Sequence, residues 1–287
     1  MSLAKIGVIG GSGLYQLDGL KVRDEVALDT PFGSPSDKLM LGELKGREVV
    51  FLARHGRGHT ISPSELNFRA NIFAMKMLGV EAILSVSAVG SMKEEIRVGD
   101  MVIVDQFFDR TRGRASTFFG DGIVAHVAFA DPTCPVLRTL LHTACQSNGI
   151  ASHNGGTYLC IEGPEFSTKA ESKIYRQWGV DVIGMTVLQE ARLAREAEIC
   201  YGAIAMSTDY DCWYEGHASV TTEMIIKVLT DNVVHARTAV AAAIQSFPDR
   251  RDCSCTKALA HAILTEPAKI PGVTRKKLEV IVGKYIK

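Results

Sequence analysis

Residues 199–213 read Ile-Cys-Tyr-Gly-Ala-Ile-Ala-Met-Ser-Thr-Asp-Tyr-Asp-Cys-Trp, an apolar run that leads directly into two acids. The run itself, residues 199–206, is typical of a strand buried inside a parallel sheet. Sites in such sheets lie outside the carboxyl ends of the strands, which is where Asp209 and Asp211 fall. Because side chains two residues apart in an extended segment lie on the same side, both carboxyls can face one ligand. The stretch predicts a strand of an α/β fold with a candidate site at its end.

Two interpretations of this acid pair remain open at this point. Two carboxyls that share a ligand can have their pKa values pushed apart, so that one holds a proton at neutral pH and can donate it to a heterocyclic nitrogen. The simpler alternative is an acidic turn that caps the next helix. The other strand ends of the chain change the balance between the two.

Length and charge describe an ordinary soluble protein. The chain has 287 residues, with 32 basic and 32 acidic side chains, so neither a basic nucleic-acid face nor an acidic tail is expected. No apolar stretch reaches transmembrane length, and the first residues show no signal-peptide pattern. We therefore expect a cytoplasmic protein with no nucleic-acid partner and no membrane partner.

Apolar runs and helical patterns alternate along the chain. Strands are expected at 5–9, 48–53, 80–89, 101–104, 157–161, 181–185 and 199–206, and helices at 62–78, 135–147, 168–178, 188–197, 220–245 and 275–285. Such alternation predicts a mainly parallel or mixed sheet with helices on both faces. One domain is expected over 1–287, with a hinge at 248–255 and a C-terminal appendage over about 248–287.

The seven cysteines do not form the framework of a secreted protein, because their number is odd and most lie inside apolar runs. Cys145, Cys160 and Cys200 are expected to be small buried hydrophobes. Cys253 and Cys255 lie in a polar stretch, so their thiols are expected to be reachable. They could be idle surface thiols, a labile disulfide or half of a metal site, although no Cys or His pair at zinc-site spacing accompanies them.

Glycines, hydroxyls and basic side chains follow several other expected strands. The turn Gly10-Gly11-Ser12-Gly13 offers backbone amides and a hydroxyl that suit an anion. It is neither a complete dinucleotide fingerprint nor a Walker sequence, and a simple tight turn is an equal alternative. Arg54 and His55 follow the next strand, where an arginine fork suits phosphate and the histidine adds a donor. A solvated basic loop is the alternative there.

Three further strand ends carry small or polar residues. These are the segments 87–91 (Ser-Ala-Val-Gly-Ser), 162–166 (Glu-Gly-Pro-Glu-Phe) and 184–186 (Gly-Met-Thr). Glycine and other small residues let a backbone approach a ligand closely. Taken with the acid pair, these strand ends predict one site for something anionic and something heterocyclic.

Eight motifs of the chain occur together in a known enzyme family. They are Ile9-Gly-Gly-Ser-Gly13, Arg54-His-Gly-Arg-Gly-His-Thr60, Asn67-Phe-Arg-Ala-Asn-Ile72, Ser91-Met-Lys-Glu-Glu-Ile-Arg-Val-Gly-Asp100, Asp105-Gln-Phe-Phe-Asp-Arg-Thr111, Ile161-Glu-Gly-Pro-Glu-Phe-Ser167, Gly184-Met-Thr186 and Thr208-Asp-Tyr-Asp-Cys-Trp213. Over about residues 4–245 the chain resembles the 5′-methylthioadenosine phosphorylases, on the trimeric side of the purine nucleoside phosphorylase family. The resemblance implies a nucleoside phosphorylase α/β fold, a central mixed β-sheet flanked by helices.

The resemblance also implies an activity and an assembly. Methylthioadenosine would be cleaved with inorganic phosphate, as a co-substrate, to adenine and 5-methylthioribose 1-phosphate. No metal and no organic cofactor would be needed, and the protein would form a homotrimer or, in the larger alternative, a hexamer.

Site roles follow from the resemblance, position by position. The catalytic positions, which recognise adenine, are Asp209 and Asp211. The phosphate positions are Ser12, Arg54, His55, Ser87, Ala88 and Thr186. The base and ribose positions are Phe166, Ser167 and Met185. The positions around the 5′ substituent are His59, Thr222, Ile225 and Ile226, with His126 arriving from a neighbouring subunit.

The chain departs from the family pattern at a few of these places. Ser12 replaces a usual threonine, Gly184 a frequent asparagine, and the segment 187–190 lacks a proline before Glu190. Thr222 is more polar than an apolar 5′ pocket suggests. A methylthioinosine phosphorylase or a general purine nucleoside phosphorylase is the alternative enzyme. A non-catalytic or nicotinamide-binding α/β protein is the alternative class, and the incomplete fingerprint counts against it.

Overall fold

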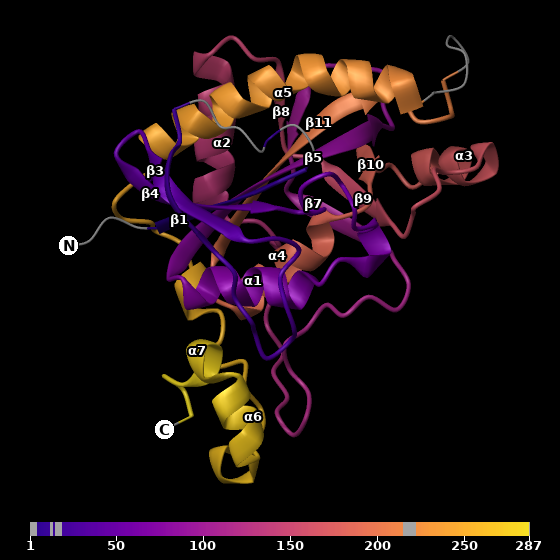
Figure 1. Ribbon diagram of the computed structural model, residues 1–287. Coiled ribbons are helices and arrows are strands. Elements are labelled where there is room, and N and C mark those ends of the chain that lie inside the picture. Colours follow the sequence, from indigo (N-terminus) through magenta and orange to yellow (C-terminus); the bar gives the residue numbers. More distant parts are fainter. Residues whose placement is uncertain (1–4, 12–13, 15–18, 215–221, 287) are drawn as a thin grey trace.

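The computed structural model describes residues 5–11, 14, 19–214 and 222–286, which build one large sheet between two layers of helices (Figure 1). The strands are β1 (Lys5–Gly10), β2 (Lys21–Val26), β3 (Leu39–Leu44), β4 (Arg47–Ala53), β5 (Val80–Ser91), β6 (Met101–Ile103), β7 (Gln106–Arg110), β8 (Ser152–Asn154), β9 (Thr157–Ile161), β10 (Val182–Gly184) and β11 (Cys200–Asp209). The helices are α1 (Phe68–Met77), α2 (Pro135–Ser147), α3 (Lys169–Gln177), α4 (Val187–Glu196), α5 (Thr222–Gln245), α6 (Gly272–Lys277) and α7 (Glu279–Val282).

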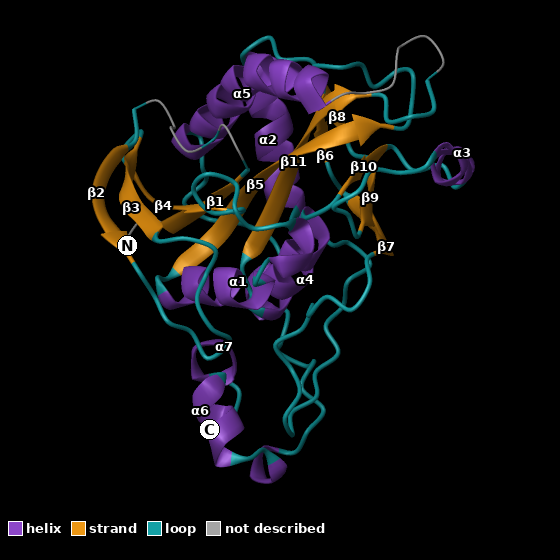
Figure 2. Ribbon diagram, turned by 45° about the vertical axis from the view of Figure 1, so that its right-hand side comes forward, coloured by secondary structure: helices purple, strands orange, loops and turns teal. Residues whose placement is uncertain are grey.

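The sheet is mixed, as expected from the alternation of elements. Its strand order is β2-β3-β4-β1-β5-β10-β9-β7, and β11 pairs with both β5 and β6. The pairs β1–β4, β1–β5 and β5–β11 are parallel, whereas β5–β10 and β6–β11 are antiparallel. Helices α1 and α4 cover one face and α2 and α5 the other (Figure 2), each face with its own hydrophobic cluster. The expected fold class, a central mixed sheet flanked by helices, is confirmed.

Strand β11 extends further than its apolar run. It is buried from Cys200 to Thr208 and still pairs with β5 at Asp209, opposite Gly90. The register shifts between Ser207 and Asp209, and such a bulge re-aims the side chains beyond it. Asp209 therefore leaves the sheet at a fixed angle rather than continuing the alternation.

The structure corrects several expected elements. The single helix expected over 62–78 is a 3-10 turn, η1 (Pro63–Glu65), and then α1, because Leu66 is extended and Asn67 caps a new helix by accepting from the Ala70 amide. The terminal helix expected over 275–285 is divided into α6 and α7 at Leu278. Strands β2, β3, β7 and β8 were not expected. β2 and β7 lie largely exposed at sheet edges, and β8 has three residues, so none of these three has an apolar run.

The C-terminal segment packs against the rest of the chain. It contains the 3-10 turns η2 (Cys255–Lys257) and η3 (Pro267–Lys269) before α6 and α7. Leu259, Ile270, Leu278 and Ile281 are buried in the hydrophobic cluster that also holds α1 and α4, and Figure 1 shows α7 beside α1. The domain boundaries remain a prediction. Within the described ranges, no helix is both long and apolar enough to cross a membrane.

Candidate active site

A cavity of about 860 Å³ lies at the carboxyl ends of the central strands. Its walls come from the carboxyl-terminal parts of β5, β10 and β11, from the segments that follow β1, β4 and β9, and from α5. It is lined by Gly11, Leu14, Arg54, His55, His59, Pro63, Val86, Ser87, Ala88, Val89, Gly90, Ile161, Phe166, Ser167, Ile183, Gly184, Met185, Thr186, Met206, Thr208, Asp209, Asp211, Val233, Val234 and Arg237. Strand ends that are far apart in sequence thus meet in one site, as the strand pattern predicted.

Most residues that the sequence singled out line this cavity. They are Arg54, His55, His59, Ser87, Ala88, Phe166, Ser167, Met185, Thr186, Asp209 and Asp211. Ser12 lies outside the described residues. Thr222, Ile225 and Ile226 belong to the first turns of α5, but their side chains lie outside the description. His126 does not line the cavity of its own chain; its amide donates to the Ala262 carbonyl at 2.8 Å.

Arg54 is buried at one end of the cavity and is already paired. Its Nε donates to Glu190 Oε1 at 2.5 Å, its Nη2 to Ser85 Oγ at 2.7 Å and to Glu190 Oε2 at 3.3 Å, and its Nη1 to the Val86 carbonyl at 2.9 Å. Four of the five guanidinium N–H groups are therefore used. Nη1 lies 3.8 Å from where a Cβ of Gly11 would stand, beside the glycine-rich turn. The fork expected to grip phosphate thus faces Glu190, leaving one N–H for an anion.

Glu190 is the functional residue that sequence reasoning missed at this end. Ser85 Oγ and Tyr201 Oη each donate to its Oε2 at 2.8 Å, in addition to Arg54. Burial alone would raise the pKa of Glu190, but the Arg54 charge and these donors outweigh burial, and the pKa is lowered. A glutamate inside the apolar first turn of α4 (Val-Leu-Gln-Glu-Ala) was the available signal, because a buried charge requires a partner.

Hydroxyls and the N-terminus of α4 complete the end of the cavity that holds Arg54, which we call the anion end. Thr186 is the N-cap residue of α4, and its Oγ1 lies 3.4 Å from Ser87 Oγ. The N-terminus of a helix presents amide N–H groups and a partial positive charge, which favour an anion. Because the Arg54–Glu190 pair is neutral overall, the described groups here that suit an anion are these dipoles, the hydroxyls and the remaining Nη1–H.

His55 is positioned by a hydrogen bond from its own loop. Its Nδ1 lies 2.8 Å from the Ile61 carbonyl, which can only accept, so Nδ1 carries the proton. Burial and the neighbouring Arg54 charge lower the pKa of His55 to about 4. At neutral pH its Nε2 is therefore an acceptor, whereas the sequence led us to expect a donor. The His59 ring stacks on it with centroids 4.3 Å apart.

The two acids lie at another part of the cavity wall. Asp209 accepts from Thr208 Oγ1 at 2.8 Å and from the Asp211 amide at 2.7 Å. Asp211 accepts from Ser172 Oγ at 2.5 Å. Across the described ranges no basic side chain forms an ion pair with either. Burial raises the pKa of both carboxyls, with the Asp211 charge a minor addition at Asp209. The proton-holding acid expected from the sequence is favoured mainly by burial rather than by mutual repulsion.

Close packing fixes where Asp209 lies. A Cβ added at Gly90, the residue paired with Asp209, would stand 2.9 Å from Asp209 Oδ1. Any larger residue there would displace the carboxylate. Gly90 is therefore a positioning residue for the acid.

A second tight contact explains Gly184. A Cβ there would lie 2.0 Å from Tyr158 Oη, and the Thr186 amide is 3.4 Å from the same oxygen. Tyr158 thus occupies the space of a side chain at 184, which accounts for a glycine where asparagine is frequent in the family.

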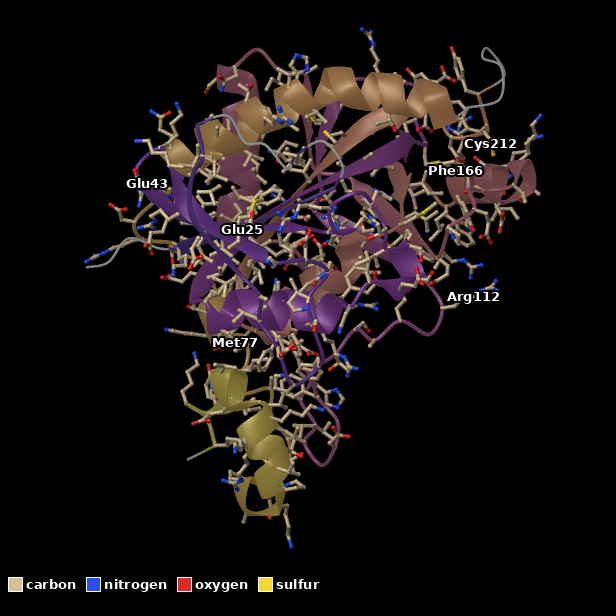
Figure 3. The ribbon with its side chains drawn as sticks, viewed as in Figure 1. Glu25, Glu43, Met77, Arg112, Phe166 and Cys212 are labelled. Carbon is tan, nitrogen blue, oxygen red and sulfur yellow. The ribbon has the colours of Figure 1, made fainter. Side chains whose placement is uncertain are left out.

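The cavity also has groups suited to a flat heterocycle and its sugar. Phe166 is 58% exposed although it lines the cavity, so its ring is available at the mouth. Figure 3 shows Phe166 and Cys212 near α3, and Cys212 Sγ lies 3.2 Å from the Ser167 carbonyl. Ser167 Oγ is buried and has no hydrogen-bond partner among the described residues. A buried hydroxyl of this kind is suited to a ligand. Met185 contributes a flexible apolar wall.

The fold and this cavity define a class of enzyme, the phosphorylases that act on nucleosides. Residues 5–245 match the family model described as the Phosphorylase superfamily, and the chain belongs to this superfamily. The S-methyl-5′-thioadenosine phosphorylase of Koribacter versatilis (strain Ellin345) is 57% identical over 98% of this chain and 97% of its own.

Two solved structures of methylthioadenosine phosphorylases are similar to this chain. A methylthioadenosine phosphorylase from an antarctic soil metagenomic library is 46% identical, with a TM-score of 0.92 over 98% of this chain and 99% of its own. The methylthioadenosine phosphorylase from Schistosoma mansoni in complex with adenine is 37% identical, with a TM-score of 0.80 over 84% of this chain and 91% of its own. The resemblance to methylthioadenosine phosphorylases expected from the sequence is confirmed.

Proposed function

We propose that the protein is a pentosyltransferase that cleaves 5′-methylthioadenosine with inorganic phosphate to give adenine and 5-methylthioribose 1-phosphate, for purine and methionine salvage. The observation that carries the proposal is the composition of the cavity. One wall offers dipoles, hydroxyls and a buried arginine, and another offers two buried acids with raised pKa values. A phosphate and a purine would be bound on either side of one sugar.

The anion end would hold phosphate against the sugar. Cleavage of an N-glycosidic bond builds positive charge on the sugar. A phosphate oriented by Ser87, Thr186 and the Arg54 Nη1–H would stabilise that charge and attack the anomeric carbon. The amide of Ala88 and the turn at Gly11, continuing into Ser12, would add main-chain donors. Because the Glu190 pair immobilises Arg54, this end needs little rearrangement on binding.

The part of the cavity wall that carries Asp209 and Asp211, which we call the acid end, would receive the departing base. Negative charge builds on the purine as the bond breaks, and a protonated Asp209 would donate to N7. Asp211, held by Ser172, would accept from the 6-amino group. Phe166 would stack on the base, and Ser167 and Met185 would contact the base and ribose. A 6-oxo purine would place its oxygen against an acceptor and would be disfavoured.

The 5′ substituent would lie against α5. Val233 and Val234 of this helix line the cavity, which gives an apolar wall, and Ile225, Ile226 and Thr222 precede them on the same helix. His59 would contact the same end. His126 lies outside the cavity of its own chain, which fits the expectation that it closes the pocket of a neighbour in a homotrimer, or in a hexamer. The cytoplasmic location remains a prediction. No metal or organic cofactor is proposed for the reaction, in which phosphate is the co-substrate.

Substrate competition tests the choice of nucleoside. Methylthioadenosine, methylthioinosine and adenosine would each be incubated in phosphate buffer, and kcat/KM would be measured from released base. We expect methylthioadenosine to be the best substrate. A higher kcat/KM for methylthioinosine would overturn the adenine assignment and favour a 6-oxopurine phosphorylase.

A further inference from the structure

Four cysteine thiols meet at the end of β11 that is remote from the cavity. Cys134 precedes α2, Cys200 begins β11, and Cys253 and Cys255 follow α5. All four Sγ atoms lie within 4.8 Å of one another, and Cys200 Sγ is 3.5 Å from Cys253 Sγ. Each cysteine is in the free thiol form. Three chain segments thus bring together four groups of a single chemistry.

The spacing of these thiols is that of a shared ion rather than of bonded sulfurs. A disulfide joins two sulfurs at about 2.05 Å. A tetrahedral zinc ion binds thiolates at about 2.3 Å, which separates neighbouring sulfurs by roughly 3.8 Å. The Cys200–Cys253 distance of 3.5 Å is too long for a disulfide, and four sulfurs within 4.8 Å of one another are close enough to share one ion.

We propose that Cys134, Cys200, Cys253 and Cys255 form a structural zinc site. The sequence left half of a metal site as one of three alternatives for Cys253 and Cys255, but it offered no matching second pair. The missing pair is Cys134 and Cys200, which come from different elements and share no zinc-site spacing, so only the fold reveals them. The expectation that both Cys253 and Cys255 are reachable is wrong for Cys255, which is buried. Cys200 is buried as expected, and its thiol lies beside the other three.

The surroundings suit a charged tetrathiolate. Cys134, Cys200 and Cys255 are buried while Cys253 is partly exposed, which gives a dry site with one entry side. Cys134 is the N-cap residue of α2, where the helix dipole favours a thiolate, and its amide is fixed by the Tyr201 carbonyl at 2.8 Å. Zinc with four thiolates carries two net negative charges.

Arg251 lies next to the thiols and can offset part of that charge. Its Nη2 pairs with Glu81 Oε2 at 2.7 Å, and its charge also interacts with Cys200. Its Nε is buried and has no hydrogen-bond partner among the described residues. A buried N–H donor of this kind can serve as an outer-sphere contact to a metal-bound sulfur.

The position in the fold makes the site structural rather than catalytic. Cys200 and Asp209 are the two ends of β11, a strand of ten residues that spans roughly 30 Å. An ion at Cys200 would fasten the start of the C-terminal segment to the sheet. The same segment is held nearby by Glu198, whose Oε1 accepts from the Leu259 amide at 3.0 Å and from Tyr285 Oη at 2.6 Å.

Metal analysis of the full-length protein tests the proposal. The protein, purified without chelator in parallel with and without reductant and supplied with Zn²⁺, would be analysed by elemental analysis and intact native mass spectrometry. We expect one zinc per chain. The Cys253→Ser variant should lose most of it, whereas Cys145→Ser, a buried cysteine outside the cluster, should retain it. Cobalt-exchanged wild type should show the absorption of a tetrahedral tetrathiolate.

The two alternatives, disulfides and idle thiols, give different results in the same measurements. If a variant fails to fold, the wild-type results are sufficient to choose between them. A mass lowered by two hydrogens per bond, with no metal, would show disulfides and overturn the proposal. A fully reduced wild type that binds neither zinc nor cobalt would show idle thiols and overturn it too. Loss of zinc should lower Tm while kcat of the folded enzyme changes less than about twofold, since the cavity is remote.

Discussion

The two ends of the cavity differ in how their buried ionisable groups are stabilised. At the anion end, Arg54 and Glu190 are both buried and satisfy each other through hydrogen bonds, and the pKa of Glu190 is lowered. At the acid end, Asp209 and Asp211 are surrounded by hydroxyls and amides without a cation from the described part of the chain, and burial raises their pKa values. The first end keeps its charges fixed; the second favours a carboxyl that takes up and releases a proton. This difference is what a reaction with a stationary anion and a departing base requires.

The largest expected effect comes from the acid end. The Asp209→Asn substitution should lower kcat for methylthioadenosine by about 10²–10⁴-fold, the usual contribution of one general acid. It should also shift preference toward 6-oxo purines, because an amide can donate to O6. Steady-state kinetics with both nucleosides checks this. Asp131→Asn, at an exposed carboxyl, is the control. If the Asp209→Asn enzyme kept a kcat near that of wild type, Asp209 would not be the general acid.

A substitution at the anion end should lower the stability of the protein rather than impair proton transfer. Glu190→Gln leaves the Arg54 charge buried and unpaired, which should cost about 3–5 kcal/mol of unfolding free energy. Urea unfolding measures it. Glu196→Gln should cost much less, because this buried carboxyl of the same helix accepts from Thr117 and Phe118 and pairs with no arginine of the described ranges. An equal loss of unfolding free energy in the two variants would contradict a stabilising role of the Arg54–Glu190 ion pair.

The same pair changes how Arg54 should be tested. Arg54→Ala would leave Glu190 as an uncompensated buried charge, so a lost activity would mix misfolding with weaker phosphate binding. Arg54→Lys keeps the charge and removes the planar fork. Its KM for phosphate should rise while KM for the nucleoside changes little, and the reverse pattern would exclude Arg54 from the phosphate end.

A smaller effect is expected at the 5′ pocket. An apolar pocket distinguishes a methylthio group from a smaller substituent by about 1–3 kcal/mol, or roughly 10–200-fold in kcat/KM. Methylthioadenosine should exceed adenosine by this factor, and His126→Ala should reduce the preference without altering the phosphate requirement. Mixed trimers of His126→Ala and Asp209→Asn chains should regain activity, since some sites would combine two intact residues. No recovery in verified mixed trimers would contradict a pocket closed by a neighbour.

The smallest effect is a difference in pH dependence between the two ends. Asp209 has a raised folded-state pKa, so its stabilising contribution is complete below the unfolded value of about 3.8 and is lost as pH rises through the folded pKa. Glu190 has a lowered one, so its contribution is present above about 4.5 and is lost as pH falls through the folded pKa. Wild type should therefore lose stability relative to Asp209→Asn as pH rises, and relative to Glu190→Gln as pH falls. Urea titrations across pH would show slopes of opposite sign; slopes of one sign would contradict the comparison.

The sequence predicted the elements that carry their own signal. Apolar runs located β4, β5 and β11, and polar residues near their carboxyl ends predicted that Arg54, Ser87 and Asp209 share one cavity. It could not predict β2 or β7, because exposed edge strands have no apolar run. It also could not pair Arg54 with Glu190 or join the four cysteines, since these contacts link distant segments and depend on the sheet that brings them together.

The phosphate dependence of adenine release distinguishes a phosphorylase from a hydrolase. The enzyme would be incubated with methylthioadenosine in buffer with and without inorganic phosphate, and the sugar product identified by phosphorus NMR and mass spectrometry. We expect adenine release only with phosphate, with one 5-methylthioribose 1-phosphate formed per adenine. Equal adenine release without phosphate, with free methylthioribose as the product, would show hydrolysis and contradict it.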